Sequence, residues 1–149
     1  MKKEFSHLNG AGAVRMVNVG AKPIQRPRAT ATGKLICQPA TIRALKRNAL
    51  PKGDVLTVAQ IAGIQAAKRT SGLIPLCHPL GLSCVEVPFK VRLTAVEIFC
   101  TTETNGPTGV EMEALTGVSV AALTLYDMCK AVDQTMSIEA VHVLEKIKE

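Results

Sequence analysis

The sequence predicts an α+β two-layer sandwich, in which helices pack on one face of an antiparallel sheet. Two observations favour this class. Segments with strand and helix periodicity follow in the order strand, two helices, strand, strand, short strand, helix and strand. In addition, only residues 90–92 connect two neighbouring strands, and so short a connection makes them an antiparallel hairpin. The length of 149 residues is typical of one domain, and we divide the chain into an arm (1–28) and a single domain (29–149).

Residues 1–28 are predicted to form a basic arm outside the core. Asparagine and glycine at positions 9–12 interrupt regular structure, and residues 21–28 hold two prolines among three basic residues. Such an arm is either disordered or laid on another surface. Arg26 and Arg28 are candidate contacts for an anion, although a run of this kind is more often a solvated tail.

The first half of the domain predicts a strand and two helices. Residues 29–37 form the strand, and residues 39–48 form a helix with Pro39 in its first turn. Residues 55–69 form the second helix, with Asp54 as its N-cap. The apolar face of this second helix is predicted to run through Val58, Ile61, Ala62 and Ala66.

Lys52 and His78 occupy positions that suit ligand binding. Lys52 precedes the second helix, where backbone N–H groups attract anions, although most such lysines are merely solvated. His78 lies in an apolar loop over residues 71–81, which Pro75 and Pro79 keep out of regular structure. A half-buried loop could present this imidazole as an acid, a base or a hydrogen-bond donor, but a lone histidine is more often structural.

The second half of the domain predicts strands around one long helix. Residues 82–91 and 93–104 form the hairpin, residues 110–113 a short strand, residues 114–132 the helix and residues 136–144 the last strand. Pro88 implies that the first of these strands lies at an edge or contains a bulge.

Four ionisable residues interrupt the apolar run around the long helix. Glu111 and Glu113 are two apart in the short strand and are therefore expected to point to the same face. Asp127 and Lys130 are three apart in the helix and can form an ion pair. Burying an unpaired charge is costly. The spacing alone leaves two alternatives open, a functional site and a solvated rim with an ordinary helix pair.

Charge and cysteine content restrict the possible partners and the compartment. Residues 1–52 contain eleven Lys or Arg and one acidic residue, Glu4, which indicates a partner that carries phosphate. The four aromatic residues are scattered, so a small phosphorylated ligand is favoured over a polynucleotide; a surface that serves only solubility is the alternative. Five irregularly spaced cysteines indicate neither disulfides nor a zinc site. With no signal peptide or membrane span in view, we expect a cytoplasmic protein.

Three long motifs resemble those of one family. The molybdenum cofactor biosynthesis protein C family, the cyclic pyranopterin monophosphate synthases, has in this order motifs similar to KGDVLTVAQIAGIQAAKRT (52–70), LIPLCHPL (73–80) and GPTGVEMEALTGVSVAALTLYDMCKAV (106–132). The resemblance covers residues 16–144.

This resemblance implies a ferredoxin-like catalytic domain and a homohexamer, a trimer of dimers with its active sites at the dimer interface. It also implies a lyase that converts 3′,8-cyclo-7,8-dihydro-GTP into cyclic pyranopterin monophosphate with release of pyrophosphate. The substrate would be supplied by a radical S-adenosylmethionine enzyme, and no metal, cofactor, nucleic acid or membrane partner is expected. The competing class is a non-enzymatic module that binds nucleotides or nucleic acid, which the basic first third would suit.

The matching motifs also imply individual site residues. The catalytic residues would be Asp127, Lys130 and Lys52. The substrate-binding residues would be Leu76, Cys77, His78, Glu111, Met112 and Glu113. Where the family usually carries an arginine this chain has Pro27, so either Arg26 or Arg28 would take over that anion contact.

Each of these residue types suits a part of the chemistry. Lys52 and Lys130 can neutralise the charge that develops on the leaving pyrophosphate. We expect the ion pair to lower the pKa of Asp127 and to support the charged form of Lys130, and we expect the pair to move protons during ring opening, with Lys130 the stronger candidate for general acid. Glu111 and Glu113 suit hydrogen bonds to guanine-type N–H groups, with Met112 between them.

Overall fold

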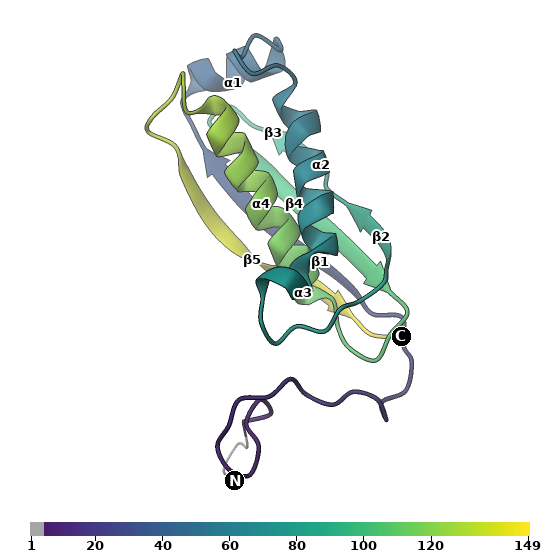
Figure 1. Cartoon of the computed structure of the whole chain (residues 1–149). Coiled ribbons are helices and arrows are strands. Elements are labelled where there is room, and N and C mark those ends of the chain that lie inside the picture. Colours follow the sequence, from purple (N-terminus) through teal and green to yellow (C-terminus); the bar gives the residue numbers. More distant parts are fainter. Residues whose placement is uncertain (1–4) are drawn as a thin grey trace.

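The computed structural model describes residues 5–149 as a five-stranded antiparallel sheet with helices on one face (Figure 1). The elements are β1 (Arg28–Ile36), α1 (Pro39–Lys46), α2 (Val55–Lys68), α3 (Thr70–Leu73), β2 (Leu82–Glu86), β3 (Phe89–Val91), β4 (Ala95–Thr104), α4 (Glu111–Cys129) and β5 (Ser137–Ile147). In space the strands follow the order β2–β4–β1–β5, and β3 also pairs with β4. With α2 and α4 as the connecting helices this is a ferredoxin-like order, so the predicted fold class is confirmed. Residues 1–4 of the predicted arm lie outside the described residues.

The core lies between the sheet and α4. Alternate residues of β1 and β4 point toward the helices and are buried: Ala29, Ala31, Leu35, Val96, Ile98 and Cys100. At Gly33 in β1, an added Cβ atom would lie 2.8 Å from Cγ1 of Val118 in α4. The missing side chain therefore lets α4 cross the sheet at close range.

The two long helices pack against each other through small residues. A Cβ atom on Gly63 would lie 3.0 Å from the carbonyl oxygen of Gly117. The start of α2 lies beside the end of α4, since Lys52 hydrogen-bonds to Asp127. The helices consequently run in opposite directions (Figure 1), and each end of α4 has different neighbours.

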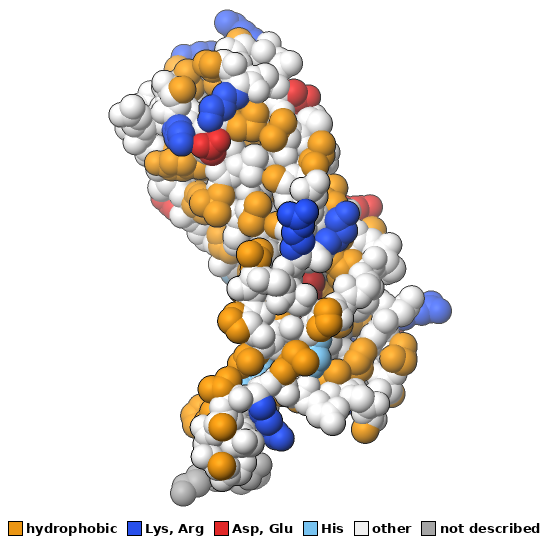
Figure 2. Space-filling view, in the orientation of Figure 1, with side chains coloured by type: hydrophobic (Ala, Val, Ile, Leu, Met, Phe, Trp, Pro, Cys, Tyr) orange, Lys and Arg blue, Asp and Glu red, His pale blue; other side chains and the backbone are white. Residues whose placement is uncertain are grey.

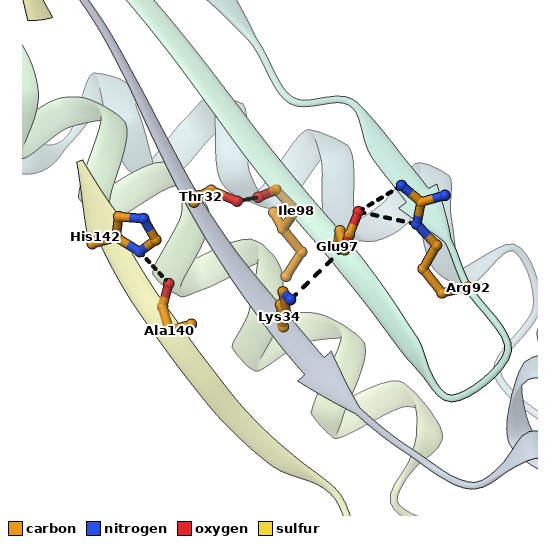
Figure 3. Close-up of polar contacts among 7 residues, drawn as sticks. All are labelled: Thr32, Lys34, Arg92, Glu97, Ile98, Ala140 and His142. Carbon is orange, nitrogen blue, oxygen red and sulfur yellow. Dashed lines mark hydrogen bonds and ion pairs between the residues drawn. The ribbon is translucent and has the colours of Figure 1, made fainter. Parts of the chain in front are cut away.

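The sheet face turned away from the helices carries polar side chains (Figure 3). Glu97 of β4 lies between Lys34 and Arg92, with N–O distances of 3.8 and 3.1 Å. On β5, Nδ1 of His142 donates to the carbonyl oxygen of Ala140 at 2.7 Å. The sheet itself separates this polar face from α4.

The second helix begins as predicted but turns a different side to the core. Oδ1 of Asp54 accepts a hydrogen bond from the Thr57 amide at 3.1 Å, which confirms the N-cap. Ala66 is buried as expected, whereas Val58 and Ile61 are 44% and 52% exposed, so that part of the prediction is wrong. The helix is apolar on both sides, and its smaller side chains face α4 because they permit closer packing. The buried side consists of Val55, Ala59, Gly63, Ala66 and Ala67.

The start of α4 also differs from the prediction. Residues 110–113 do not form a short strand, because Val110 is the N-cap and the helix begins at Glu111. Carboxylates in a first helical turn are stabilised by the positive end of the helix dipole. Residues two apart on a helix point in different directions. The prediction that Glu111 and Glu113 share a face is therefore wrong.

The loop and hairpin predictions hold with two changes. Residues 71–73 belong to α3, so the irregular loop is shorter than expected. The predicted strand 82–91 is interrupted at Val87 and Pro88, which separates β2 from β3. β3 pairs with β4 from Phe89 opposite Ile98, which confirms the hairpin.

Candidate active site

A pocket of about 270 Å³ lies at the end of the molecule where α4 begins. The N-terminal arm forms one wall, the loop after α3 another, and residues 108–113 the third. The predicted site residues that line it are Leu76, Cys77, His78, Glu111, Met112 and Glu113. The structure thus brings both predicted substrate-binding motifs, which are far apart in the sequence, into one pocket.

His78 is fixed in the pocket wall by the arm. Its Nε2 atom lies 2.6 Å from the carbonyl oxygen of Val17. A carbonyl oxygen only accepts, so Nε2 carries the proton and donates. In the neutral ring Nδ1 is then the acceptor. This histidine can therefore offer a hydrogen-bond acceptor to a ligand while its other nitrogen holds the arm.

Glu111 is held in its ionised form by a lysine from β5. Lys146 Nζ lies 2.5 Å from Oε1 of this carboxylate. Burial is the largest single influence and would raise the pKa of Glu111, but the hydrogen bonds from Lys146 and from its own backbone, together with the charges of Lys146 and Lys148, outweigh it and lower the pKa. Its second oxygen, Oε2, is buried and has no hydrogen-bond partner among residues 5–149. Within the described chain, Glu111 therefore retains an unused acceptor.

Glu113 is in the opposite electrostatic situation. Only 4% of this residue is exposed, and burial, followed by the nearby charge of Glu111, raises its pKa. Burial and the two carboxylates also raise the pKa of the Cys77 thiol, which disfavours a thiolate nucleophile. Two carboxylates whose pKa values move apart can divide the roles of base and acid. In this pocket Glu111 suits the ionised role and Glu113 the protonated role.

A second cluster lies at the opposite end of α4. Asp127 Oδ1 lies 2.7 Å from Nζ of Lys130, and Asp127 Oδ2 lies 3.0 Å from Nζ of Lys52. The i,i+3 pair predicted from the sequence is thus confirmed, and Lys52 joins it. Lys52 also donates to the main-chain carbonyl of Asp127 at 3.1 Å, where the negative end of the helix favours cations.

Asp127 and Lys130 shift each other's pKa in the directions expected for an exposed ion pair. Hydrogen bonds from Lys130 and then from Lys52 lower the pKa of Asp127. The hydrogen bond to Asp127 raises the pKa of Lys130. Both lysine side chains are about half exposed, at 43% and 56%. The cluster therefore presents permanent positive charge to solvent and to any anion that binds there.

The two clusters are too far apart in one chain to act on the same atom. Fourteen residues of α4 separate Glu113 from Asp127, which corresponds to about 21 Å at the helical rise. Proton transfer requires contact at about 3 Å. The structure therefore groups the predicted site residues into a pocket and a lysine–aspartate cluster, and it does not bring the two groups together.

The two arginines proposed as alternatives differ in their surroundings. Arg28 starts β1, and its Nε lies 3.3 Å from Oε1 of Glu103. Arg26 makes no ion pair within residues 5–149, while its main-chain N–H donates to the carbonyl of Glu149. Arg26 is consequently the better placed of the two for an external anion.

The sequence reasoning missed several polar residues of the pocket, among them two with ionisable side chains. His7 and Lys22 come from the arm and line the pocket. In sequence they stand apart from every motif and resemble ordinary residues of a basic tail. Only the folded path of the arm places them there. Within residues 5–149 no cluster of three His, Cys, Asp or Glu side chains could hold a metal ion, and no helix is long and apolar enough to cross a membrane.

Fold and site define a class of protein, a ferredoxin-like α+β domain with a carboxylate–imidazole pocket and a separate lysine–aspartate cluster. The sequence profile of the MoaC family matches residues 16–148. A cyclic pyranopterin monophosphate synthase of Chloroflexus aggregans is 53% identical over 145 residues, which cover 96% of this chain and 88% of that protein. The cyclic pyranopterin monophosphate synthase 1 of Mycobacterium tuberculosis is 54% identical over 95% of this chain and 84% of that protein.

A bifunctional molybdenum cofactor biosynthesis protein of Chlorobaculum tepidum is also 54% identical to this chain. The match covers 96% of this chain and 46% of that protein, so this chain spans about half of its length. Profile and relatives agree over nearly all of the sequence. The chain therefore belongs to the MoaC family.

Proposed function

We propose that this protein is a cyclic pyranopterin monophosphate synthase of molybdenum cofactor biosynthesis, a lyase that acts on 3′,8-cyclo-7,8-dihydro-GTP. One observation carries the proposal. The motifs shared with the family supply two sites of opposite charge, a carboxylate-lined pocket and a lysine-rich cluster. A substrate with a guanine-derived ring system and a triphosphate needs both kinds of site.

The pocket suits the ring system of this substrate. The unused oxygen of Glu111 can accept a hydrogen bond from a ring N–H or amino group. Glu113, whose pKa is raised by burial, can hold a proton and return it during ring opening. A heterocycle offers both N–H donors and acceptors to these two groups, whereas a triphosphate offers only anionic oxygens. The heterocycle is therefore the part of the substrate that binds here.

The lysine–aspartate cluster suits the triphosphate. Lys52 and Lys130 carry exposed positive charge next to each other, and both are held by Asp127. Two cations in fixed positions can stabilise the charge that builds up on pyrophosphate as the cyclic phosphate closes. Because Asp127 raises the pKa of Lys130, this lysine stays protonated in the free protein. It can give up its proton once the substrate competes for Asp127.

A complete site requires two copies of the chain. The pocket and the cluster lie about 21 Å apart along α4, so one substrate cannot join them at one reacting centre within a chain. A two-fold axis across the middle of the helical layer would place the end of α4 in one copy beside its start in the partner. Each dimer would then hold two identical composite sites.

The outer surface of the helical layer supports such a dimer. Val58 and Ile61 of α2 and Leu123 of α4 are 44%, 52% and 58% exposed. Figure 2 shows hydrophobic side chains along this face of the molecule, with basic side chains around an acidic one toward the α1 end. Exposed apolar side chains on packed helices are typical of a surface that a partner covers. We extend the proposal to a hexamer, a trimer of such dimers, in the cytoplasm.

The test of the proposed function is a direct conversion. The purified protein is supplied with the cyclised dihydro-GTP made by a radical S-adenosylmethionine enzyme. We expect release of pyrophosphate together with the fluorescent oxidation product of the pterin. If a folded oligomer yields neither product, the proposed function is wrong, and a steep dependence of binding on salt would then favour the nucleic-acid-binding class.

A further inference from the structure

The N-terminal arm is a structural part of the pocket rather than a tail beside it. Five of the fourteen residues that line the pocket belong to the arm: Ser6, His7, Val17, Val19 and Lys22. The body of the domain supplies the other walls from the loop after α3 and from the start of α4. Removing the arm would leave these two walls open to solvent. The arm therefore decides whether a ligand in the pocket is enclosed.

A small hairpin in the arm fixes the position of His7. Residues Leu8 and Val14 form an antiparallel bridge, and the carbonyl of His7 accepts a hydrogen bond from the Arg15 amide at 2.8 Å. Oδ1 of Asn9 closes the turn by accepting from two backbone N–H groups of the hairpin, at 3.0 and 2.8 Å. Such locally encoded geometry is not needed in a solvated tail. It fixes the main chain of His7, and therefore the point from which the imidazole extends, beside the pocket.

Two attachments hold this hairpin against the pocket. The carbonyl of Val17 accepts the hydrogen bond from His78 at 2.6 Å. Further along the arm, Gln25 and Gly106 exchange main-chain hydrogen bonds at 3.1 and 3.0 Å, which ties the arm to the segment before α4. The arm is therefore bonded to the domain at two points, Val17 and Gln25. The partner at the first point, His78, is a predicted site residue.

From this geometry we infer that His7 is a substrate-contacting residue, and that residues 5–19 form a strap that closes over the heterocycle. The inference rests on the proposed function. His7 shares the pocket with two carboxylates, Glu111 and Glu113, and with His78 and Lys22. Because the heterocycle is placed beside these two carboxylates, His7 faces the ring system. Its imidazole can hydrogen-bond to a ring carbonyl or ring nitrogen, and the strap excludes water above it.

The first test compares two histidine variants. His7→Gln removes the imidazole from the strap, whereas His142→Gln removes an imidazole that is bonded to Ala140 on β5. Loss of one hydrogen bond to the substrate predicts a rise in KM of about threefold to tenfold for His7→Gln, with kcat nearly unchanged. His142→Gln should match the wild type. Equal KM values for the wild type and His7→Gln would overturn the inference.

The second test asks whether the strap closes on a ligand. Lys22 and Arg26 each precede a proline, so Arg15–Met16 is the bond within residues 5–27 that trypsin can cut. We expect bound substrate, or GTP as a stable guanine nucleotide, to slow cleavage at Arg15. The cut enzyme, once the segment up to Arg15 has dissociated, lacks both His7 and most of the strap and should show a rise in KM at least as large as that of His7→Gln. Equal cleavage rates with and without ligand would show that residues 5–19 do not close over the ligand.

The two tests distinguish failure of the inference about His7 from failure of the proposed synthase function. If the wild type forms product and His7→Gln is unaltered, the synthase assignment stands and the role of His7 falls. If the wild type forms no product, the synthase assignment falls. Protection of Arg15 by GTP then decides whether the strap closes over a guanine ring.

Discussion

Glu111 and Glu113 are only two residues apart, yet their surroundings give them opposite acid–base behaviour. Lys146 reaches Glu111 from β5, whereas Glu113 is buried in the pocket wall and makes no ion pair within residues 5–149. The pKa of the first is lowered and the pKa of the second is raised. The hydrogen bond and charge of Lys146, helped by the backbone of Glu111 and the charge of Lys148, thus favour ionisation of Glu111 over Glu113.

Removal of this lysine should change the pH dependence of the enzyme. In Lys146→Met the hydrogen bond and charge of Lys146 no longer oppose the effect of burial, so the pKa of Glu111 rises above that in the wild type. If catalysis needs ionised Glu111, the acid limb of the profile of kcat/KM against pH should move to higher pH. Lys34→Met, on the far face of the sheet, serves as the control and should not move the profile. An acid limb in the same place for Lys146→Met would exclude a role for ionised Glu111.

Asp127 and Lys130 should matter for turnover rather than for stability, because both side chains are exposed. Asp127→Asn and Lys130→Ala should each lower kcat by about 100-fold or more, which is the usual loss when a proton-transfer group is removed. Steady-state kinetics with the cyclised substrate measures this, and Lys46→Ala at the exposed end of α1 is a matched control. Turnover near that of the wild type in both variants would disprove the catalytic assignment.

At the scale of elements, the close packing of α4 positions both clusters. Gly117, the one glycine of this helix, allows contact with α2 on one side and with the sheet on the other. At Gly117 an added Cβ atom would lie 2.5 Å from Sγ of Cys100, which is fully buried. The helix cannot shift away from the sheet at this point without moving its two ends.

We therefore expect Gly117→Ala to destabilise the fold. Overpacking of about 1–3 kcal/mol exceeds the gain of about 1 kcal/mol in helix propensity. Gly72→Ala in α3 is the control, since an added Cβ atom there meets no atom within 4 Å. Urea unfolding should show a lower midpoint for Gly117→Ala and an unchanged or higher midpoint for Gly72→Ala. A midpoint for Gly117→Ala at or above that of the wild type would contradict the packing argument.

The turn after α4 is joined to α1 by one buried carboxylate. Asp133 is 3% exposed and accepts hydrogen bonds from the Gln38 amide, the Thr41 hydroxyl and the amide and hydroxyl of Thr135. Burial opposes ionisation, but these donors outweigh it and lower the pKa of Asp133 to about 2. The carboxylate therefore stabilises the folded state wherever it is ionised.

This linkage predicts a dependence of stability on pH. Because the pKa in the folded state lies below the value of 3.8 in the unfolded chain, the contribution is complete above about pH 4 and disappears as the pH falls through about 2. Asp133→Asn should lower the free energy of unfolding by about 2 kcal/mol at pH 7. The difference from the wild type, measured by denaturant titration, should narrow between pH 4 and pH 2. A difference independent of pH would show that the charge has no role.

At the scale of the whole molecule, the distance between the two clusters governs what one chain can do. The pocket depends on the arm, the loop and the start of α4, and the cluster on Lys52 and the end of α4. Their separation of about 21 Å is the basis of our proposal that a complete site combines two copies of the chain.

Mixed oligomers should reveal this composite site. Lys52→Ala damages the cluster and Glu113→Gln damages the pocket, so each variant alone should be nearly inactive. When the two are unfolded and refolded together, half of the dimers are mixed, and each mixed dimer has one intact site. Activity should recover to about a quarter of the wild-type value. No recovery in a mixture that forms oligomers would show that both clusters of one chain serve the same site.

Much of the fold could be predicted because its signals are local. The periodicity of β1, α2 and β4, the Asp54 cap and the i,i+3 pair of Asp127 and Lys130 each depend on neighbours along the chain. The start of α4 could not be read in this way, because a few residues after a turn fit a strand and a helical turn equally well. The matching motifs implied most of the site residues but carried no information about their arrangement.

The sequence by itself determined the fold class, the ion pair between Asp127 and Lys130, and the family of this protein. Only the tertiary structure decided how those residues are grouped. Lys52 bonds to Asp127, which is 75 residues away in the sequence. Lys146 bonds to Glu111, which is 35 residues away, and His78 bonds to Val17 of the arm, which is 61 residues away. The first two contacts depend on where α4 lies on the sheet, and close packing of small side chains sets that position. Local patterns cannot encode it, because it arises from all the packed elements together.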